Sequence, residues 1–373
     1  MGRKAGRETL RPVAGEGVTR PWPDGPFLAL DLDTFERNVK HLADTIVVQG
    51  GKQWRPHTKA LRSPEIAKRL IAAGAHGVTC ATAWEAQVMV DAGIQNVLIA
   101  SQVVAPSARR KLALMNRTAR VMAAIDSPAH VALLNTAAQA AATVIPVVVE
   151  VDIGLGRAGV APGPAAVQLA RTVLTHAHLR FCGVMAWEGQ TTRFTDPVEK
   201  EAAIRASVGL LTDTARQCVE AGIPVEIVSC GGTGTYPMTS RIDGVTELQA
   251  GGGVFGDLRY RHDFKMPLER ALTLVATVLS RPSARRIVSD AGWKYHGYHP
   301  TQSQPLRLPG NASLAFSAEH LTLDCDTDVN TFAVGDRIEF AVSYADSTVF
   351  LHQELFAMRN GVIEDVLPLP ARP

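Results

Sequence analysis

The chain has 373 residues, an apolar content of 46% and a formal net charge of +2 at pH 7. This length and composition are typical of one large α/β domain with a smaller second domain, and they argue against a disordered chain. The near balance of positive and negative charges does not suggest a surface that binds nucleic acid or an anionic membrane, so we expect a small-molecule partner.

No apolar run approaches the ~20 residues of a membrane helix, and residues 1–20 lack the apolar core of a signal peptide, which predicts a cytoplasmic protein. The five cysteines are widely spaced without a Cys-x-x-Cys pair and read as reduced thiols.

A strand is expected at 27–32, with Thr34 as the cap of the helix after it. Eight short apolar runs then alternate with helical patterns, such as 63–73, where Ser63 is a candidate cap. Strict alternation predicts a parallel sheet, and eight Val/Ile-rich strands favour a closed (β/α)8 barrel of the TIM type over an open doubly wound sheet. The predicted barrel strands are 53–57, 77–81, 97–100, 120–125, 144–151, 181–186, 225–229 and 245–249.

Near residue 271 the helical period ends, and strand-like runs with turn residues follow. We therefore expect an N-terminal extension over 1–25, a barrel domain over 26–270 and an all-β domain over 271–373. The strand at 27–32 precedes the eight barrel strands and could pair with the β domain instead. The predicted strands of the second domain are 272–280, 286–289, 313–316, 337–342, 348–351 and 355–359.

In a barrel the catalytic groups lie at the carboxyl ends of the strands, and Lys59 follows the first of them. Pro56 and His57 precede it, and no acidic residue is adjacent. A lysine at a strand end can simply reach solvent, but a lone amine at the barrel mouth is also a candidate nucleophile for a carbonyl carbon.

Glycines follow several other strand ends. The fifth strand continues into 153–160, which contains Arg157, and the sixth ends at Trp187. The seventh is followed by 229–236 (SCGGTGTY) and the eighth by 251–253 (GGG). The recurrent phosphate site of such barrels lies after strands seven and eight, where glycine amides can donate to the phosphate. A lysine on the same rim as a phosphate site suggests pyridoxal 5'-phosphate (PLP).

At this point the residues resemble a known family, the fold-type III PLP enzymes of the D-threonine aldolase, D-serine dehydratase and D-3-hydroxyaspartate aldolase group. These enzymes share an alanine-racemase-like barrel followed by a β domain, and the resemblance implies a homodimer in which each β domain completes the partner's active site. The matching segments are 30–33, 36–38, 55–59, 77–86, 91–94, 183–189, 229–236, 247–251, 290–292, 317–320, 334–336 and 365–368.

The resemblance assigns roles residue by residue. Lys59 is similar to the lysine that joins the cofactor aldehyde, with His57 beside it as a further catalytic candidate. Arg157 looks like the arginine near that lysine, and Trp187 stands where relatives often have tyrosine. The residues that resemble the cofactor's phosphate cradle are Ser229, Gly232, Thr233, Gly234, Gly251 and Gly252.

Two positions depart from the family pattern. Relatives bind a divalent metal (Mn, Mg or Zn) in the β domain through His-x-Asp or His-x-Cys, and here the aligned residues are Tyr344 and Asp346. A phenol of pKa ~10 in place of an imidazole should weaken metal binding severely. Many relatives also have a histidine two positions after the lysine, where this chain has Leu61.

The resemblance implies a lyase that cleaves or forms the Cα–Cβ bond of a β-hydroxy D-amino acid, giving an aldehyde and glycine or a substituted glycine. If no metal is held, the base for the β-hydroxyl is sought among His57, Tyr344, Asp346 and His352. The alternatives are an amino-acid racemase that uses Lys59 and Tyr344, a D-serine dehydratase-like lyase, and a protein that holds PLP without turnover. The substrate side chain cannot be read from the sequence.

Overall fold

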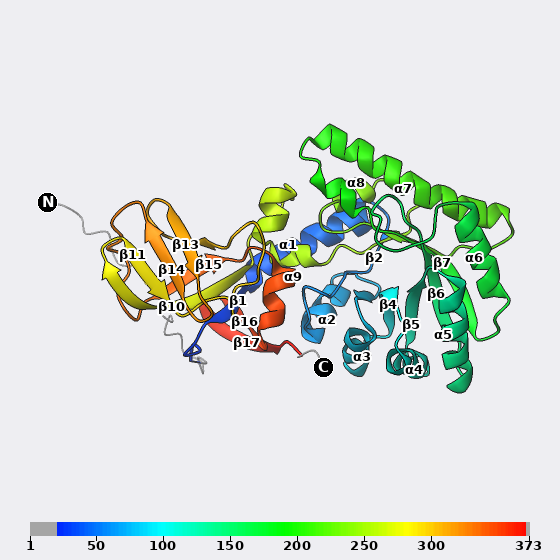
Figure 1. Ribbon diagram of the computed structural model, residues 1–373, viewed down its shortest axis with the longest axis horizontal. Coiled ribbons are helices and arrows are strands. Elements are labelled where there is room, and N and C mark those ends of the chain that lie inside the picture. The colour runs from blue at the N-terminus through cyan, green and yellow to red at the C-terminus, as the bar shows by residue number, and fades with distance from the viewer. Residues whose placement is uncertain (1–20, 371–373) are drawn as a thin grey trace. The chain divides into compact units, whose positions relative to one another are not determined.

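The structure is a computed structural model that describes residues 21–370 (Figure 1). The chain forms two compact units. The barrel unit contains residues 39–253 and 263–266, and the β unit contains the described residues up to 38, then 254–262 and 267–370. The extension expected over 1–25 lies mostly outside the described residues.

Eight parallel strands form the sheet of the barrel unit, in the order β2-β9-β8-β7-β6-β5-β4-β3. Each lies within or beside one of the eight apolar runs, which confirms the predicted (β/α)8 fold. The strands are β2 (Gln53–Trp54), β3 (Val78–Cys80), β4 (Asn96–Gln102), β5 (Arg120–Ile125), β6 (Ile145–Glu150), β7 (Leu179–Met185), β8 (Ile227–Cys230) and β9 (Glu247–Leu248).

The segment just after β2 closes the barrel. The amide of His57 donates to the Gln249 carbonyl (3.0 Å), which joins this segment to the chain after β9. On the other side His57 pairs with Thr79 in a parallel bridge, and the Thr58 amide donates to the Thr79 carbonyl (2.7 Å). Lys59 is the first residue beyond this doubly paired segment, so barrel closure places it at the rim.

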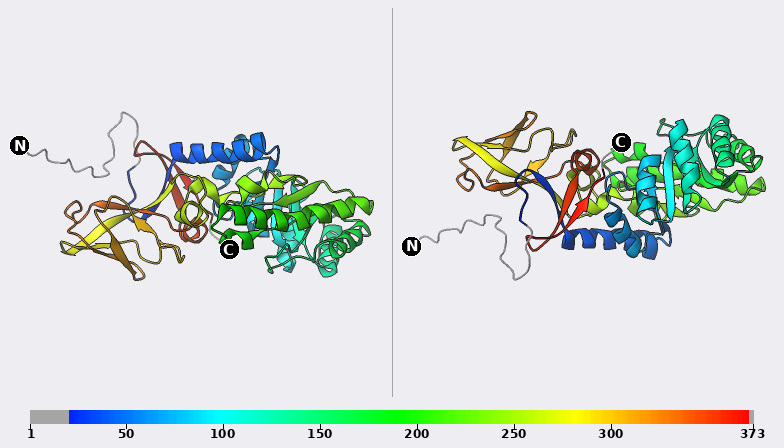
Figure 2. Two further views of the ribbon diagram at one scale, coloured as in Figure 1. Left: turned by 90° about the horizontal axis from the view of Figure 1, so that it is seen from above. Right: turned by 90° about the horizontal axis from the view of Figure 1, so that it is seen from below.

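Helices cover the outside of the barrel strands (Figures 1 and 2). Five of the described helices begin with proline, whose fixed φ suits the first helical position and whose missing N–H leaves no donor unsatisfied there. The helices are α1 (Leu32–Ala43), α2 (Pro64–Ala72), α3 (Ala83–Asp91), α4 (Pro106–Met115), α5 (Pro128–Ala140), α6 (Pro164–Leu174), α7 (Pro197–Glu220), α8 (Tyr236–Thr239) and α9 (Ala345–Thr348). Shorter 3₁₀ and π turns are η1 (Asp44–Gln49), η2 (Gly189–Arg193), η3 (Gly252–Phe255), η4 (Arg259–Asp263) and η5 (Val349–Leu351).

The β unit is built on one nine-stranded, mostly antiparallel sheet. Strand β1 (Phe27–Asp31) belongs to it and lies between β10 and β16, antiparallel to the first and parallel to the second. Phe27 and Ala29 pack with Val275 and Met358, because alternate residues of a strand face the same side. The other strands are β10 (Leu272–Ser283), β11 (Arg286–Ser289), β12 (Gln304–Pro305), β13 (Ala312–Phe316), β14 (Leu321–Cys325), β15 (Arg337–Ala341), β16 (Glu354–Arg359) and β17 (Val362–Pro368).

Several local expectations differ from the structure. Residues 348–351 are not a strand but the end of α9 and the turn η5. Helix α1 begins at Leu32, and Asp31 rather than Thr34 caps it, since the Asp31 carboxylate accepts the Thr34 amide (2.7 Å). Ser63 precedes α2 as expected, but its side chain makes no capping hydrogen bond.

The compact units also divide the chain differently from the boundary that we expected near residue 270. Segment 254–262 belongs to the β unit, because the Leu258 and Arg259 amides donate to the carbonyls of Val342 and Ser343 (3.0 Å each). Within residues 21–370, no helix is both long and apolar enough to cross a membrane.

A buried ion pair links the first and last barrel strands. Arg55 follows β2, and its Nε lies 2.9 Å from the Glu247 carboxylate in β9, with both side chains 1% exposed. His76 also reaches Glu247 (3.2 Å). Burial opposes ionisation of Glu247, but Arg55 and His76 outweigh it and lower its pKa to about 2. The pair therefore holds the closing strands together only while Glu247 is charged.

We predict that Glu247→Gln destabilises the protein at pH 7 by about 3–5 kcal/mol, because it leaves the Arg55 charge buried without its partner. A carboxylate whose folded pKa is depressed stabilises the fold above its unfolded pKa and loses that effect as the pH falls. The parent should therefore lose stability between pH 4.5 and about 2, and the variant should lose less in that range. Thermal unfolding against pH measures both, with the exposed Glu220→Gln as control; equal midpoints for parent and Glu247→Gln would contradict the prediction.

Candidate active site

Lys59 and His57 lie together on the turn that follows β2. The Lys59 side chain is exposed, and the Lys59 amide donates to Nδ1 of His57 (3.3 Å). Burial, followed by the positive charges of Lys59 and Arg157, lowers the pKa of His57 well below its usual value. The imidazole is therefore neutral at pH 7, with Nδ1 accepting the Lys59 amide and the proton on Nε2.

Arg157 comes from the glycine-rich turn after β6. The turn is held by Asp152, whose Oδ1 accepts the amides of Gly154 and Gly156 (3.0 Å each). Arg157 lies 3.8 Å from Glu150, a carboxylate that also accepts a hydrogen bond from Gln102 (2.5 Å). The Arg157 side chain is still 61% exposed, so its guanidinium can reach a ligand at the mouth.

Trp187 follows β7 and lies against the turn after β8. A Cβ added to Gly232 would come within 2.6 Å of the six-membered ring of Trp187. Glycine is therefore required at position 232 by the indole as well as by any ligand. The aromatic ring and the glycine-rich turn form one continuous surface.

Glu188 fixes the glycine-rich turn after β8 through three hydrogen bonds. Its carboxylate is fully buried and accepts the Gly231 amide (3.1 Å) and the hydroxyls of Thr235 and Thr239 (2.7 Å each). Since the Thr235 proton goes to Glu188, the Thr235 oxygen is left to accept the Gly232 amide (3.1 Å). Two of the turn's amides are thus directed inward, away from a ligand.

The next two amides of the turn remain for a ligand. Among residues 21–370 no acceptor is hydrogen-bonded to the buried amides of Thr233 and Gly234. The Thr233 hydroxyl accepts the Gly253 amide (3.0 Å), which leaves its own proton to donate. Buried N–H groups without a protein acceptor are uncommon and indicate a ligand or water. Their number and direction suit an anion such as phosphate.

The remaining cradle candidates support the same turn. Ser229 is fully buried in β8 and accepts a hydrogen bond from the Gln249 amide group (2.9 Å). Gly251 lies directly against the backbone of His57, where no Cβ could be placed. Gly252 begins the 3₁₀ turn η3. These contacts join the chain after β9 to the turn that carries Lys59.

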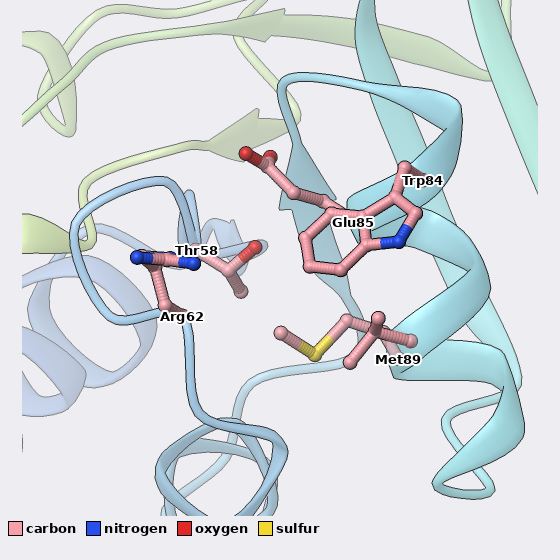
Figure 3. A pocket seen from close by; sticks show the side chains of 6 residues that line it. Thr58, Arg62, Trp84, Glu85 and Met89 are labelled. Carbon is pink, nitrogen blue, oxygen red and sulfur yellow. The ribbon is translucent and has the colours of Figure 1, made fainter. Parts of the chain in front are cut away.

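A small pocket lies beside the same turn (Figure 3). Trp84 and Met89 of α3 line one side, and Thr58 and Arg62 line the other. Its cavity volume of about 10 Å³ is far below the ~300–1,000 Å³ typical of ligand sites. We therefore do not assign the cofactor to it.

Tyr344 and Asp346 belong to the β unit, where they lie beside 257–260. Their chain segment is held by Asp257, whose Oδ2 accepts the Ala345 amide (2.8 Å). The Arg259 guanidinium lies 4.3 Å from the centre of the Tyr344 ring. Burial and then the charge of Asp346 raise the pKa of Tyr344, so the phenol stays protonated at pH 7.

The residues at this position do not fit the divalent metal that the resemblance implies. Within the described part of the chain there is no group of three His, Cys, Asp or Glu side chains that could hold a metal ion. Asp257 is unsuited because its two oxygens already accept the Tyr260 and Ala345 amides. Asp346 is then the only carboxylate that these segments offer as a ligand.

Several of these residues were missed from the sequence. The sequence analysis does not single out Glu188, Glu150, Thr235, Asp257 or Arg259. Their functional neighbours come from other strands or from a distant segment, so no local pattern marks them. The one usable signal was Glu188 itself, a carboxylate immediately after a buried apolar strand.

The family model described as "Alanine racemase, N-terminal domain" matches residues 30–259, which is more than half of the chain. The chain belongs to this family. A model of a serine dehydratase domain matches residues 271–358. Both matches confirm the resemblance drawn from the sequence.

Individual relatives agree over nearly the whole chain. It is 31% identical to D-threonine aldolase of an Arthrobacter species, over 97% of this chain and 96% of the relative. It is 30% identical to 3-hydroxy-D-aspartate aldolase of Paracoccus denitrificans, over 93% and 92%. The crystal structure of D-threonine aldolase from Filomicrobium marinum superposes with a TM-score of 0.88 at 34% identity and covers 93% of this chain and 94% of that one.

We predict that Glu188→Gln weakens the binding of inorganic phosphate to the turn. The glutamine amide group brings N–H donors to a point where three donors already converge, and one unsatisfied group costs about 1–3 kcal/mol. The measurement is the rise in thermal unfolding midpoint on adding phosphate, which should be present in the parent and lost in the variant. Thr239→Val is the control, since it removes one donor to Glu188 without touching the turn amides. An unchanged phosphate response in Glu188→Gln would contradict the prediction.

Proposed function

We propose that this protein is a PLP-dependent lyase that cleaves the Cα–Cβ bond of a β-hydroxy D-amino acid, giving an aldehyde and glycine or a substituted glycine. The observation that carries the proposal is the position of Lys59 on the same rim of the barrel as a glycine-rich turn with two available amides. The aldolase activities named for the two curated relatives support the choice of reaction.

The barrel mouth fits PLP on three counts. Lys59 is an exposed amine at the end of β2, which suits a covalent link with the cofactor aldehyde. The Thr233 and Gly234 amides suit the phosphate. Gly232 lets the Trp187 indole lie against the turn, where a Cβ would come within 2.6 Å of the ring, and this places an aromatic ring beside the amides. Ser229, Gly251 and Gly252 would support this cradle through the contacts described above.

When bound, PLP supplies an electron-accepting ring that stabilises negative charge on the substrate Cα. The protein residues have the remaining tasks. Lys59 would hold the cofactor until the substrate amine replaces it, and Arg157 would provide a positive charge near the bound molecule. Trp187 would pack beside it and exclude water from the Gly232 side.

The base for the β-hydroxyl is sought among four residues, of which His57 is the one from the barrel unit. It is neutral at pH 7 and lies two residues from Lys59 on the same turn. A positioned base contributes about 10²–10⁴ to the rate. Tyr344, Asp346 and His352 remain alternatives from the β unit, and a second copy of the chain could supply them in the homodimer that the family resemblance implies. We propose this homodimer together with a cytoplasmic location.

Dehydration of a β-hydroxy D-amino acid is the second candidate, because the serine dehydratase domain model matches the β unit. The two reactions give different products from the same substrate. Aldol cleavage releases an aldehyde and glycine, whereas dehydration releases a keto acid and ammonia. Incubation with D-threonine, D-serine and 3-hydroxy-D-aspartate, with assays for all four products, separates them.

We predict that Lys59→Ala abolishes covalent attachment of PLP and reduces aldehyde release at least about a hundredfold. Borohydride reduction of the parent followed by peptide mass spectrometry should place the cofactor mass on the peptide that contains Lys59. Lys68→Ala, an exposed lysine of α2, is the control and should behave like the parent. Cofactor fixed at another lysine in the parent, or unchanged activity in Lys59→Ala, would refute the assignment.

We also predict that activity survives exhaustive dialysis against EDTA, because Tyr344 and Asp346 offer only one hard carboxylate. The rate before and after dialysis, with the metal content of each sample, tests this. Complete loss of activity followed by recovery on adding Mn²⁺ would rule out the metal-independent reaction.

A further inference from the structure

Two hydrogen-bonded segments, 257–260 and 342–346, form the surroundings of Tyr344 and Asp346. The amides of Leu258 and Arg259 donate to the carbonyls of Val342 and Ser343 (3.0 Å each). The backbone around residues 344–346 is therefore fixed relative to 257–260. Any cation at this position would be close to the side chains of both segments.

Both carboxylate oxygens of Asp257 are already engaged. Asp257 is buried and accepts the Tyr260 amide (3.0 Å) and the Ala345 amide (2.8 Å), one on each oxygen. The Tyr344 phenol is hydrogen-bonded to Asp346. Asp257 thus has a protein hydrogen-bond donor on each oxygen, where a metal ligand would leave an oxygen pointing at the ion.

Arg259 supplies a positive charge at the same place. Its guanidinium carbon lies 4.3 Å from the Tyr344 ring centre, a cation–π distance, and Tyr260 packs edge-on against the same ring at 6.1 Å. Arg259 also interacts electrostatically with Asp257 and Tyr344. A divalent ion held by residue 344 would lie within a few ångströms of this charge, and like charges at such distances repel strongly when water is largely excluded.

We propose that Arg259 excludes divalent metal ions from the Tyr344–Asp346 position, because its guanidinium already provides the positive charge there. Tyr344, which offers no imidazole, and Arg259, which brings a positive charge, then act in the same direction. Restoring the histidine alone leaves the repulsion in place. This inference concerns metal binding by the β unit and holds whether or not the proposed lyase activity is found.

The experiment measures Mn²⁺ binding by electron paramagnetic resonance with the purified full-length protein and four variants. The parent and Tyr344→His should both bind Mn²⁺ weakly. The double variant Tyr344→His/Arg259→Gln should bind it about ten- to a hundredfold more tightly, in the range by which neighbouring groups change metal affinity. Tyr344→His/Arg259→Lys keeps the positive charge and should resemble Tyr344→His.

The matched control is Tyr344→His/Arg261→Gln, which removes a positive charge two residues away whose Nε donates to the Leu268 carbonyl (3.0 Å). It should bind Mn²⁺ no better than Tyr344→His, and thermal unfolding checks that each variant is folded. The proposal is overturned if Tyr344→His binds as tightly as the double variant, if the parent binds Mn²⁺ stoichiometrically, or if the folded double variant gains no affinity.

Discussion

Everything at the barrel mouth depends on how the parallel sheet closes. Residues 55–58 hydrogen-bond to the chain after β9 on one side and to Thr79 on the other, so β2 has no free edge at its carboxyl end. Lys59 is the next residue, and the glycine-rich ends of β8 and β9 arrive at the same rim because parallel strands point the same way. The buried pair of Arg55 and Glu247 ties the two closing strands from inside. The contacts that close the barrel are therefore the same contacts that position Lys59 at its rim.

The turn after β8 shows how a buried acid can prepare an anion site. Glu188 is itself negative, yet it accepts three hydrogen bonds and so uses donors that face inward. Its acceptance of the Thr235 proton obliges that oxygen to accept the Gly232 amide. Within residues 21–370, the amides of Thr233 and Gly234 remain without a protein acceptor. The proposed anion site thus consists of the amides that are left after the other donors of the turn have bonded to acceptors within the protein.

Tyr344 lies at the centre of a cluster of interacting groups in the β unit. It stands where the family resemblance implies a metal-binding histidine, and its phenol is hydrogen-bonded to Asp346. Arg259 stacks on the ring and brings one positive charge where a divalent ion would bring two. In the reaction that we propose, side chains would then carry out the β-hydroxyl chemistry.

The sequence by itself determined the architecture and placed a candidate nucleophile, Lys59, at the end of the first barrel strand. Strand periodicity, helix-starting prolines and glycines after strand ends are local signals, and they were enough to predict the barrel, the β domain and the roles of Lys59 and the turn after β8. Only the tertiary structure decided which amides of that turn are available, which unit residues 254–262 join, and that Arg259 lies over Tyr344. These contacts join residues up to about 85 positions apart, and burial and hydrogen-bond direction depend on packing that no local pattern encodes.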